Sequence, residues 1–215
     1  MAGLFITFEG GEGAGKTTQI NRLAQSLTNQ GLKVITTREP GGTPEGEKIR
    51  DLIVQREGGK WSPVSETLLL FAARSLHVQR VIKPALDDGH IVICDRFTDS
   101  TRAYQGYGHG LEMKIIEDLN QTVLKGLEPD LTFILDIEPK AGLSRSERRL
   151  ASEALDIKQK EDRFESLDLS FHEKLRKGFL EIADNNKERC VVLDASKSLK
   201  EIADKTLELT KAKMV

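Results

Sequence analysis

A glycine-rich loop near the start of the chain constrains the fold more than any other feature. Residues 10–17 read Gly-Gly-Glu-Gly-Ala-Gly-Lys-Thr and match the pattern G-x-x-x-x-G-K-[ST] in full. An apolar run at residues 4–8 precedes the loop, and apolar residues at helical spacing follow it over residues 17–30. In such a strand-loop-helix unit, backbone N–H groups converge on phosphate oxygens at the positive end of the helix. The loop therefore predicts binding of a nucleoside triphosphate.

The residues of this loop have distinct roles toward phosphate. Glycines let the backbone approach the oxygens, Lys16 bridges phosphates, and the Thr17 hydroxyl is a ligand for Mg²⁺. The alternative, a glycine-rich turn that only caps a helix, is disfavoured by the full match to the pattern. We expect the nucleotide to be bound by Gly10, Gly11, Glu12, Gly13, Ala14, Gly15, Lys16, Thr17 and Thr18.

The remaining apolar runs predict the rest of a sheet. They lie at residues 33–37, 91–94, 131–137 and 190–193. Helix-length segments such as residues 65–86 separate them, and Gly31 and Gly89 are typical helix stops. Apolar strands joined by helical crossovers indicate an α/β fold, with a parallel sheet covered by helices on both faces. In that architecture ligands bind beyond the carboxyl ends of the strands.

Composition excludes several classes of protein. The chain has 215 residues, 38% hydrophobic and 31% charged, so we expect one globular domain over residues 1–215. No apolar stretch approaches the roughly 20 residues that span a bilayer, and we see no signal peptide. The only cysteines, Cys94 and Cys190, lie in apolar runs, which fits a reducing cytoplasm. A net charge of −2 gives no general attraction to nucleic acid or to a membrane.

Phosphate-binding loops serve GTPases, transport and motor ATPases, and small-molecule kinases. A GTPase needs an Asn-Lys-x-Asp base reader, whereas the nearest string, residues 186–189, ends in arginine and runs into an apolar strand. Transport and motor ATPases usually carry a further coupling domain, for which this chain has no room. A small kinase instead needs a second anion site that faces the first.

Two loops after predicted strands supply candidates for this second site. Arg38 follows the second run, and Asp95 and Arg96 follow the third. Asp95 is placed to hold a magnesium-bound water near Thr17, while Arg96 can bind a phosphate with two parallel hydrogen bonds. A lone Asp-Arg pair would more often be a structural ion pair. Anion-binding features at successive strand ends favour the functional interpretation.

One charged segment, residues 140–163, departs from the alternation of strands and helices. It contains few large apolar residues and the basic residues Lys140, Arg145, Arg148, Arg149, Lys158, Lys160 and Arg163. A solvated face is the common explanation for such a charge run. Because the segment follows the fourth strand, we predict an exposed helix pair or lid over the crevice.

At this point the chain resembles the thymidylate kinase family, and the resemblance runs essentially from end to end. The strings that carry it are residues 9–18 (Glu-Gly-Gly-Glu-Gly-Ala-Gly-Lys-Thr-Thr), 38–43 (Arg-Glu-Pro-Gly-Gly-Thr), 81–86 (Val-Ile-Lys-Pro-Ala-Leu), 95–96 (Asp-Arg), 100–101 (Ser-Thr), 103–106 (Ala-Tyr-Gln-Gly), 129–132 (Pro-Asp-Leu-Thr) and 162–165 (Asp-Arg-Phe-Glu). The resemblance implies a P-loop nucleoside-monophosphate-kinase fold with a five-stranded parallel sheet. It also implies phosphorylation of dTMP to dTDP with ATP and Mg²⁺, within dTTP synthesis, by a cytoplasmic homodimer.

Roles for individual residues follow from the same resemblance. It makes Arg74 and Arg96 a clamp on the phosphate of dTMP, and Thr101 a contact to the thymine edge. Tyr104 becomes the sensor of the missing 2′-hydroxyl, and Glu12 a carboxylate near the acceptor sugar. Related chains place an aromatic residue four positions before the arginine, where this chain has leucine, so we expect neighbouring Phe71 to stack on thymine. The full set of predicted substrate-binding residues is Arg38, Phe71, Arg74, Arg96, Ser100, Thr101, Tyr104 and Gln105.

The family resemblance also bears on the source of the cation that stabilises the transition state. Some thymidylate kinases carry an arginine inside the phosphate loop, whereas others have glycine there and arginines in the lid. This chain has Gly13 in the loop, so it resembles the bacterial type with lid arginines. Arg149 best matches the catalytic lid arginine, and Arg145, four residues earlier, would share its helix face. We therefore expect Lys16, Arg96, Arg149, Arg145 and Glu12 to be the catalytic residues.

Two other functions stay open on sequence alone. One is phosphorylation of a different small molecule, and the other is a regulatory nucleotide-binding module that transfers no phosphate. The combination of Arg96, Thr101 and Tyr104 argues against both. If the acceptor is a phosphate monoester, no general base is needed, because its second pKa of about 6 leaves it mostly dianionic at neutral pH.

Overall fold

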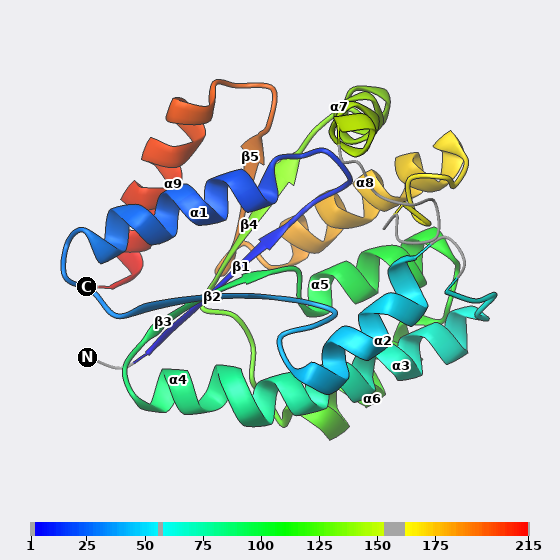
Figure 1. Cartoon of the computed structure of the whole chain (residues 1–215), viewed down its shortest axis with the longest axis horizontal. Helices are drawn as coiled ribbons and strands as arrows, with labels where there is room; N and C mark the ends of the chain where they lie inside the picture. The colour runs from blue at the N-terminus through cyan, green and yellow to red at the C-terminus, as the bar shows by residue number, and fades with distance from the viewer. Residues whose placement is uncertain (1–2, 56–57, 153–161, 215) are drawn as a thin grey trace.

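The strands form one parallel sheet. The computed structural model describes residues 3–55, 58–152 and 162–214. Its strands pair in the order β2-β3-β1-β4-β5, and every pair is parallel (Figure 1). The predicted five-stranded sheet is confirmed, with each end within one residue of its expected place. The strands are β1 (Leu4–Glu9), β2 (Val34–Arg38), β3 (Ile91–Asp95), β4 (Leu131–Asp136) and β5 (Cys190–Asp194).

Helices cover both faces of this sheet. The α-helices are α1 (Lys16–Thr28), α2 (Pro44–Val54), α3 (Pro63–His77), α4 (Lys83–Asp87), α5 (Thr98–Thr101), α6 (Met113–Leu124), α7 (Pro139–Ser152), α8 (Leu169–Asn185) and α9 (Leu199–Lys213). Two π-helical segments, η1 (Val78–Ile82) and η2 (Arg102–Gly108), continue α3 and α5. Within the described residues, no helix combines the length and apolar character needed to cross a bilayer.

The central strand β1 carries apolar residues on both faces of the sheet, because both faces are covered. Leu4, Ile6 and Phe8 pack into a cluster with residues of α1 and α9. Phe5 points to the other face and packs with residues of η1, β3 and α6. A strand enclosed on both faces loses the alternation of apolar and polar residues, which is typical of parallel sheets in α/β proteins. All six residues of β1 are accordingly buried.

The long helical pattern at residues 65–86 becomes three consecutive helical segments. Helix α3 begins two residues earlier than predicted, because Pro63 occupies its first turn and the Ser62 side chain accepts a hydrogen bond from the backbone N–H of Ser65. The π-helical segment η1 then connects α3 to α4 without a break in the helical path. Composition and spacing gave no signal for the π-helical turn.

Charged side chains gather at one edge of the sheet. Every strand ends in a charged residue, and parallel pairing brings the strand ends together at the same edge, which the pairing register records. These terminal residues are Glu9, Arg38, Asp95, Asp136 and Asp194. The carboxyl edge is therefore the polar edge of an otherwise apolar sheet, and this is where such folds bind ligands.

Candidate active site

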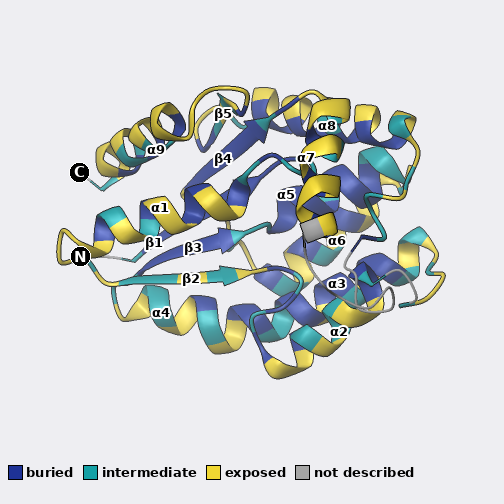
Figure 2. Cartoon of the chain, turned by 45° about the horizontal axis from the view of Figure 1, so that its top comes forward, coloured by how far each residue is buried: buried dark blue, intermediate teal, exposed yellow. Residues whose placement is uncertain are grey.

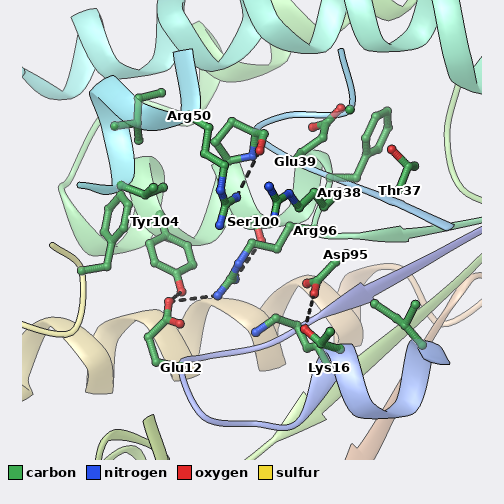
Figure 3. A pocket seen from close by; sticks show the side chains of 18 of the residues that line it. Glu12, Lys16, Thr37, Arg38, Glu39, Arg50, Asp95, Arg96, Ser100 and Tyr104 are labelled. Atoms are coloured by element: carbon green, nitrogen blue, oxygen red, sulfur yellow. Dashed lines mark hydrogen bonds and ion pairs between the residues drawn. The ribbon is translucent and has the colours of Figure 1, made fainter. Parts of the chain in front are cut away.

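A cavity of about 860 Å³ opens at the carboxyl ends of β1, β2 and β3. It contains both sets of residues that the sequence singles out, the phosphate loop and the arginine-bearing loops opposite (Figure 3). The predicted residues that line it are Glu12, Gly13, Ala14, Gly15, Lys16, Thr17, Thr18, Arg38, Arg74, Asp95, Arg96, Ser100, Thr101, Tyr104, Gln105 and Arg149. Gly10 and Gly11, the first two residues of the loop, are outside the described lining, and their carbonyl oxygens accept hydrogen bonds from Lys16.

Gly13 occupies a position that no other residue fits. Its φ is 65°, in the left-handed region, and a Cβ there would lie 2.0 Å from the carbonyl oxygen of Gly142 in α7. The first turn of the predicted lid helix therefore packs directly on the phosphate loop. Glycine at this position permits both the turn of the loop and the close approach of the two backbones.

Lys16 and Thr17 are the first residues of α1, and both line the cavity. The Lys16 ammonium donates to the carbonyl oxygens of Gly10 and Gly11 at 3.1 and 2.9 Å, and burial lowers the pKa of this lysine. Phosphate oxygens are stronger acceptors than these neutral carbonyls. The Thr17 hydroxyl donates to Asp95 Oδ2 at 2.9 Å, so the two predicted magnesium-binding residues are in contact.

Arg96 connects the loop to the opposite wall. Its backbone φ is 68°, an uncommon conformation for a residue with a Cβ, and its guanidinium donates to Gly10 O at 3.0 Å and Glu12 Oε1 at 2.9 Å. The Tyr104 hydroxyl donates to the same oxygen of Glu12, and Arg96 lies 4.9 Å from the centre of the Tyr104 ring (Figure 3). Burial alone would raise the pKa of Glu12, but the charges of Arg96 and Lys16 lower that pKa to about 2. Glu12 is therefore a carboxylate at neutral pH.

Glu9 fixes the turn that carries Arg96. Its carboxylate is fully buried and accepts the backbone N–H of Phe97 at 2.7 Å and the hydroxyl of Ser100 at 2.5 Å. Burial and the negative charge of Asp99 raise the pKa of Glu9 to about 7, because Arg96 only partly compensates. Glu9 therefore fixes the chain directly after Arg96, through the backbone of Phe97 and the side chain of Ser100.

Arg74 lies on α3 at the far wall, away from the phosphate loop. Its Nε donates to Glu39 Oε2 at 2.7 Å and its Nη2 to Thr101 Oγ1 at 2.9 Å, while His77 Nδ1 lies 2.9 Å from the other oxygen of Glu39. Nη1 of Arg74 has no hydrogen-bond partner among the described residues. The two arginines predicted to form one clamp therefore differ in place, since Arg96 contacts the loop and Arg74 contacts the predicted base-reading threonine.

Phe71 does not lie where base stacking requires it. It is absent from the described lining of the cavity, only 2% of it is exposed, and its ring centre lies 4.8 Å from the Arg74 guanidinium. The expectation of stacking on thymine is corrected accordingly, because the ring packs behind Arg74. Leu70, one position earlier on α3, lines the cavity instead.

The lid arginines do not point together as expected. Arg149 lines the cavity, and its Nη2 lies 3.5 Å from Ser146 Oγ and 3.8 Å from Glu165 Oε1. Arg145 is outside the described lining, and its Nη1 donates to the carbonyl oxygen of Ala195 at 3.0 Å. Helical spacing was the basis for grouping Arg145 with Arg149, but the loop after β5 supplies a closer acceptor for Arg145.

Part of the predicted lid cannot be compared with the structure. Helix α7 accounts for residues 139–152, which confirms that a charged helix follows β4. Lys158 and Lys160 lie outside the described residues. Arg163 is described, and it points to Glu66 on α3, with which it forms an ion pair.

Arg50 and Glu165 are among the lining residues to which the sequence analysis gave no role. Arg50 on α2 lines the cavity and donates to Pro40 O at 3.1 Å. Glu165 also lines it, and burial together with the charge of Glu12 raises the pKa of Glu165 to about 7. Glu165 stands in a string that carried the family resemblance, whereas Arg50 lies in an ordinary amphipathic helix and had no signal.

The Asn-Lys-x-Arg string at residues 186–189 is structural. Only 6% of Arg189 is exposed, and its Nη1 donates to Asp99 Oδ2 at 2.7 Å. None of the four residues is among the described lining of the cavity. The rejection of this string as a GTPase base reader agrees with its place in the fold.

The arrangement defines a class of enzyme before any relative is considered. A parallel sheet with a glycine-rich loop after β1, facing an arginine-bearing wall across one cavity, is the P-loop nucleoside-monophosphate kinase fold. A crystal structure of thymidylate kinase from Ehrlichia chaffeensis superposes with a TM-score of 0.76 at 35% identity, covering 98% of this chain and 99% of that one.

Sequence comparisons narrow this class to one family. The thymidylate kinase family model matches residues 8–206. A thymidylate kinase of Caulobacter vibrioides is 52% identical over 92% of this chain and 90% of its own length. One from Magnetococcus marinus is 47% identical over 94% of this chain and 93% of its own. The chain belongs to the thymidylate kinase family.

Proposed function

We propose that this protein transfers the γ-phosphoryl group of ATP to dTMP and releases dTDP and ADP. One observation carries the proposal: the phosphate loop shares its cavity with a wall that bears a buried hydrogen-bond donor and a buried acceptor, both without a partner among the described residues. Arg74 Nη1 is a donor and Gln105 Oε1 is an acceptor, and neither has a partner among the described residues. A buried polar group without a partner costs about 1–3 kcal/mol, so such groups point to a ligand.

The donor side of the cavity fits ATP with Mg²⁺. Backbone N–H groups of the loop and the Lys16 ammonium would bind the phosphates. Thr17 and Asp95 would hold the ion, whose chemistry is to neutralise charge on the phosphoryl oxygens. The described residues contain no cluster of three or more His, Cys, Asp or Glu side chains suited to a metal. That suits Mg²⁺ taken up with a nucleotide, since it keeps most of its ligands from phosphate and water.

The acceptor side fits a pyrimidine nucleoside monophosphate. Arg96 and Arg38 lie nearest the loop and would hold the acceptor phosphate, with Ser100 beside Arg96. Arg74 and Thr101 are bonded to each other, so we place Arg74 at the base end and revise its predicted role in the phosphate clamp.

Tyr104 and Glu12 lie between these two ends of the acceptor site. Their hydrogen bond supports a shared role at the sugar, where Tyr104 would exclude a 2′-hydroxyl and Glu12 would meet the 3′ side.

The chemistry needs positioning and positive charge, not a base. An oxygen of the dTMP phosphate bonds to the γ-phosphorus while the bond to the bridging oxygen of ADP breaks. Lys16 and Arg96 are positioned to stabilise negative charge on the transferring group, and Arg149 approaches from the lid. Closure of α7 over the cavity would exclude water and so suppress hydrolysis of ATP.

Exposed apolar residues and buried cysteines bear on the assembly and location that we propose. Val64 and Leu68 on α3 and Ile115 on α6 are exposed apolar residues on two helices in contact, which supports a homodimer formed through this surface. We also propose that residues 1–215 form one domain. Buried free cysteines, Cys94 and Cys190, suit a cytoplasmic protein.

A coupled assay of ADP formation tests the function. The acceptors to compare are dTMP, dUMP, dCMP, AMP and none, each with ATP and Mg²⁺. We expect the highest kcat/KM with dTMP and negligible turnover without an acceptor. A preference for another acceptor would identify a different small-molecule kinase. Nucleotide binding without turnover on any of them would indicate a regulatory module.

A further inference from the structure

A buried charge cluster lies directly behind the base end of the cavity. Only 1% of Glu66 and 1% of Gln105 is exposed, and Gln105 Nε2 donates to Glu66 Oε1 at 2.7 Å. The other oxygen of Glu66 accepts a hydrogen bond from Arg163 Nη2. Arg163 also donates to the carbonyl oxygen of Ile53 at 2.6 Å, which ties the cluster to α2. Gln105 alone among these residues of the cluster faces both the cavity and Glu66.

The chemistry of Glu66 determines which end of the Gln105 amide faces it. A glutamine amide has a donor end and an acceptor end of nearly equal shape, so packing alone leaves two orientations. A carboxylate in an ion pair with arginine only accepts hydrogen bonds. Nε2 of Gln105 must therefore face Glu66, and Oε1 must face away from it. This orientation follows from the donor and acceptor inventory alone.

Because Gln105 lines the cavity and its Nε2 is held by Glu66, Oε1 is the acceptor that this side chain has available for a base bound there. It is buried and has no partner among the described residues. Thymine carries an N–H donor at N3, whereas the N3 atom of cytosine is an acceptor. An acceptor held in a fixed direction attracts the first base and repels the second, because a buried acceptor facing another acceptor leaves both unpaired.

We propose that Glu66 is a positioning residue that sets pyrimidine selectivity by locking the amide of Gln105. The proposal rests on the proposed function, since it assumes that Gln105 meets the base of the acceptor. Arg163 keeps Glu66 an acceptor, and through residues 162–165 it joins the end of the lid segment to the base pocket. Glu66 itself does not line the cavity, so it acts on the base only through Gln105.

Replacement of Glu66 by glutamine tests the proposal, because Arg163 can only donate and would hold the amide oxygen at position 66, which leaves the NH2 group of that amide to face Gln105. Gln105 would then turn Oε1 toward position 66 and its donor end toward the base. We expect the ratio of kcat/KM for dTMP to that for dCMP to fall about tenfold, through KM and not through kcat at saturating dTMP. The KM for ATP should stay within about twofold, as it reports the other side of the cavity.

A double variant provides the rescue. In Glu66→Gln combined with Gln105→Glu, the amide at position 66 donates to the carboxylate at position 105, whose second oxygen again presents an acceptor to the base. We expect selectivity for dTMP to return toward the wild-type ratio. The matched control is Glu117→Gln, which removes a carboxylate partner from Arg102 outside the described lining of the cavity and should leave the ratio unchanged.

The outcomes separate this inference from the proposed function. Wild-type protein that fails to phosphorylate dTMP overturns the function. Active wild type with an unchanged dTMP to dCMP ratio in folded Glu66→Gln overturns only the inference, since a purely structural role lowers both values equally. If Glu66→Gln does not fold, Glu66→Asp and Arg163→Met decide. Glu66→Asp keeps a carboxylate acceptor and should keep the ratio of kcat/KM for dTMP to that for dCMP. Arg163→Met removes the partner of Glu66 and should lower this ratio. The reverse pattern would contradict the proposal.

Discussion

The acceptor wall and the lid helix hold their arginines in opposite ways. On the wall, Arg74 is 2% exposed and makes hydrogen bonds of 2.7 to 3.2 Å to three other residues. On α7, the Arg149 side chain is 56% exposed, and its contacts to Ser146 and Glu165 measure 3.5 and 3.8 Å. Figure 2 shows the same contrast between the two helices, with α7 largely exposed and α3 mostly buried or intermediate.

If Arg74 contacts the acceptor and Arg149 the transferred phosphate, as we propose, this contrast separates recognition from catalysis in space. Buried charges are costly to desolvate, so the wall is stable only because each charge has its partner in place. Weak, exposed contacts on the lid are easily exchanged for contacts to a phosphate. The buried contacts of Arg74 are therefore made when the chain folds, whereas in the proposed mechanism Arg149 exchanges exposed contacts for a phosphate. Changes to the two regions should have different kinetic and thermodynamic effects.

Lys16→Ala removes the positive charge of the lysine in the phosphate loop and should have the largest effect on turnover. We expect turnover to fall by about 10³ or more, because a phosphate-cradling cation acts mainly in the transition state. The measurement is kcat at saturating ATP and dTMP, with the melting temperature as a check of folding. Lys33→Ala is the control, since Lys33 pairs with Asp88 and is 61% exposed. Near-normal turnover in folded Lys16→Ala would exclude the loop from the mechanism.

Arg149→Ala tests the lid side alone. We expect kcat to fall by about 10² with little change in the KM for dTMP or in stability, because the contact forms mainly in the transition state. Single-turnover kinetics should locate the loss in the chemical step. Arg148→Ala is the matched control, since its Nε donates to Ser144 O within its own helix at 3.1 Å and it is outside the described lining. If Arg149→Ala and Arg148→Ala both turn over at near wild-type rates, the lid only covers the cavity and supplies no catalytic arginine at position 149.

Glu9→Gln tests the buried side by its pH dependence. Burial raises the pKa of Glu9 to about 7 from 4.5. The unfolded state therefore loses its proton first as pH rises, and the free energy of unfolding falls between these values. Between pH 5 and pH 7 we expect wild type to lose about 2 kcal/mol relative to Glu9→Gln, which cannot titrate. Chemical denaturation at several pH values measures this, and a constant difference between the proteins would contradict the assignment.

Tyr104→Ala should narrow sugar selectivity at the boundary between the regions. Its hydroxyl contacts Glu12 and its ring lies beside Arg96, so the ring limits the space at the sugar. We expect the preference for dTMP over its ribonucleotide analogue to fall about tenfold in kcat/KM. Tyr104→Phe keeps the ring and should keep the preference. If both variants discriminate like wild type, another residue excludes the 2′-hydroxyl.

The fold was predictable because its signals are local. Short apolar runs separated by helical patterns located all the strands, and the glycine-rich loop fixed where the site begins. The contact between Thr17 and Asp95 also follows from chain order, since both stand at the edge where parallel strands end. Features set by spacing within one helix or strand, or by position at the end of a strand, can therefore be predicted from the sequence alone.

Side-chain direction depended on neighbours that spacing does not reveal. Arg145 and Arg149 share a helix face, yet the carbonyl of Ala195 draws Arg145 away from the cavity. Phe71 is adjacent to the expected stacking position, but the one-residue shift turns its ring behind Arg74. Arg50 faces the cavity only because α2 packs against α3. These placements arise from long-range packing between segments distant in sequence.

The contact between Gly13 and Gly142 links the residue that the phosphate loop can carry at position 13 to the position of the lid helix α7. A side chain at position 13 would meet the Gly142 carbonyl oxygen at 2.0 Å, so an arginine cannot enter the loop while α7 stays in place. If Arg149 supplies the catalytic cation, as we propose, a cation placed at position 13 instead would require the start of α7 to shift. The residue at position 13 and the position of the lid helix are therefore linked by sterics.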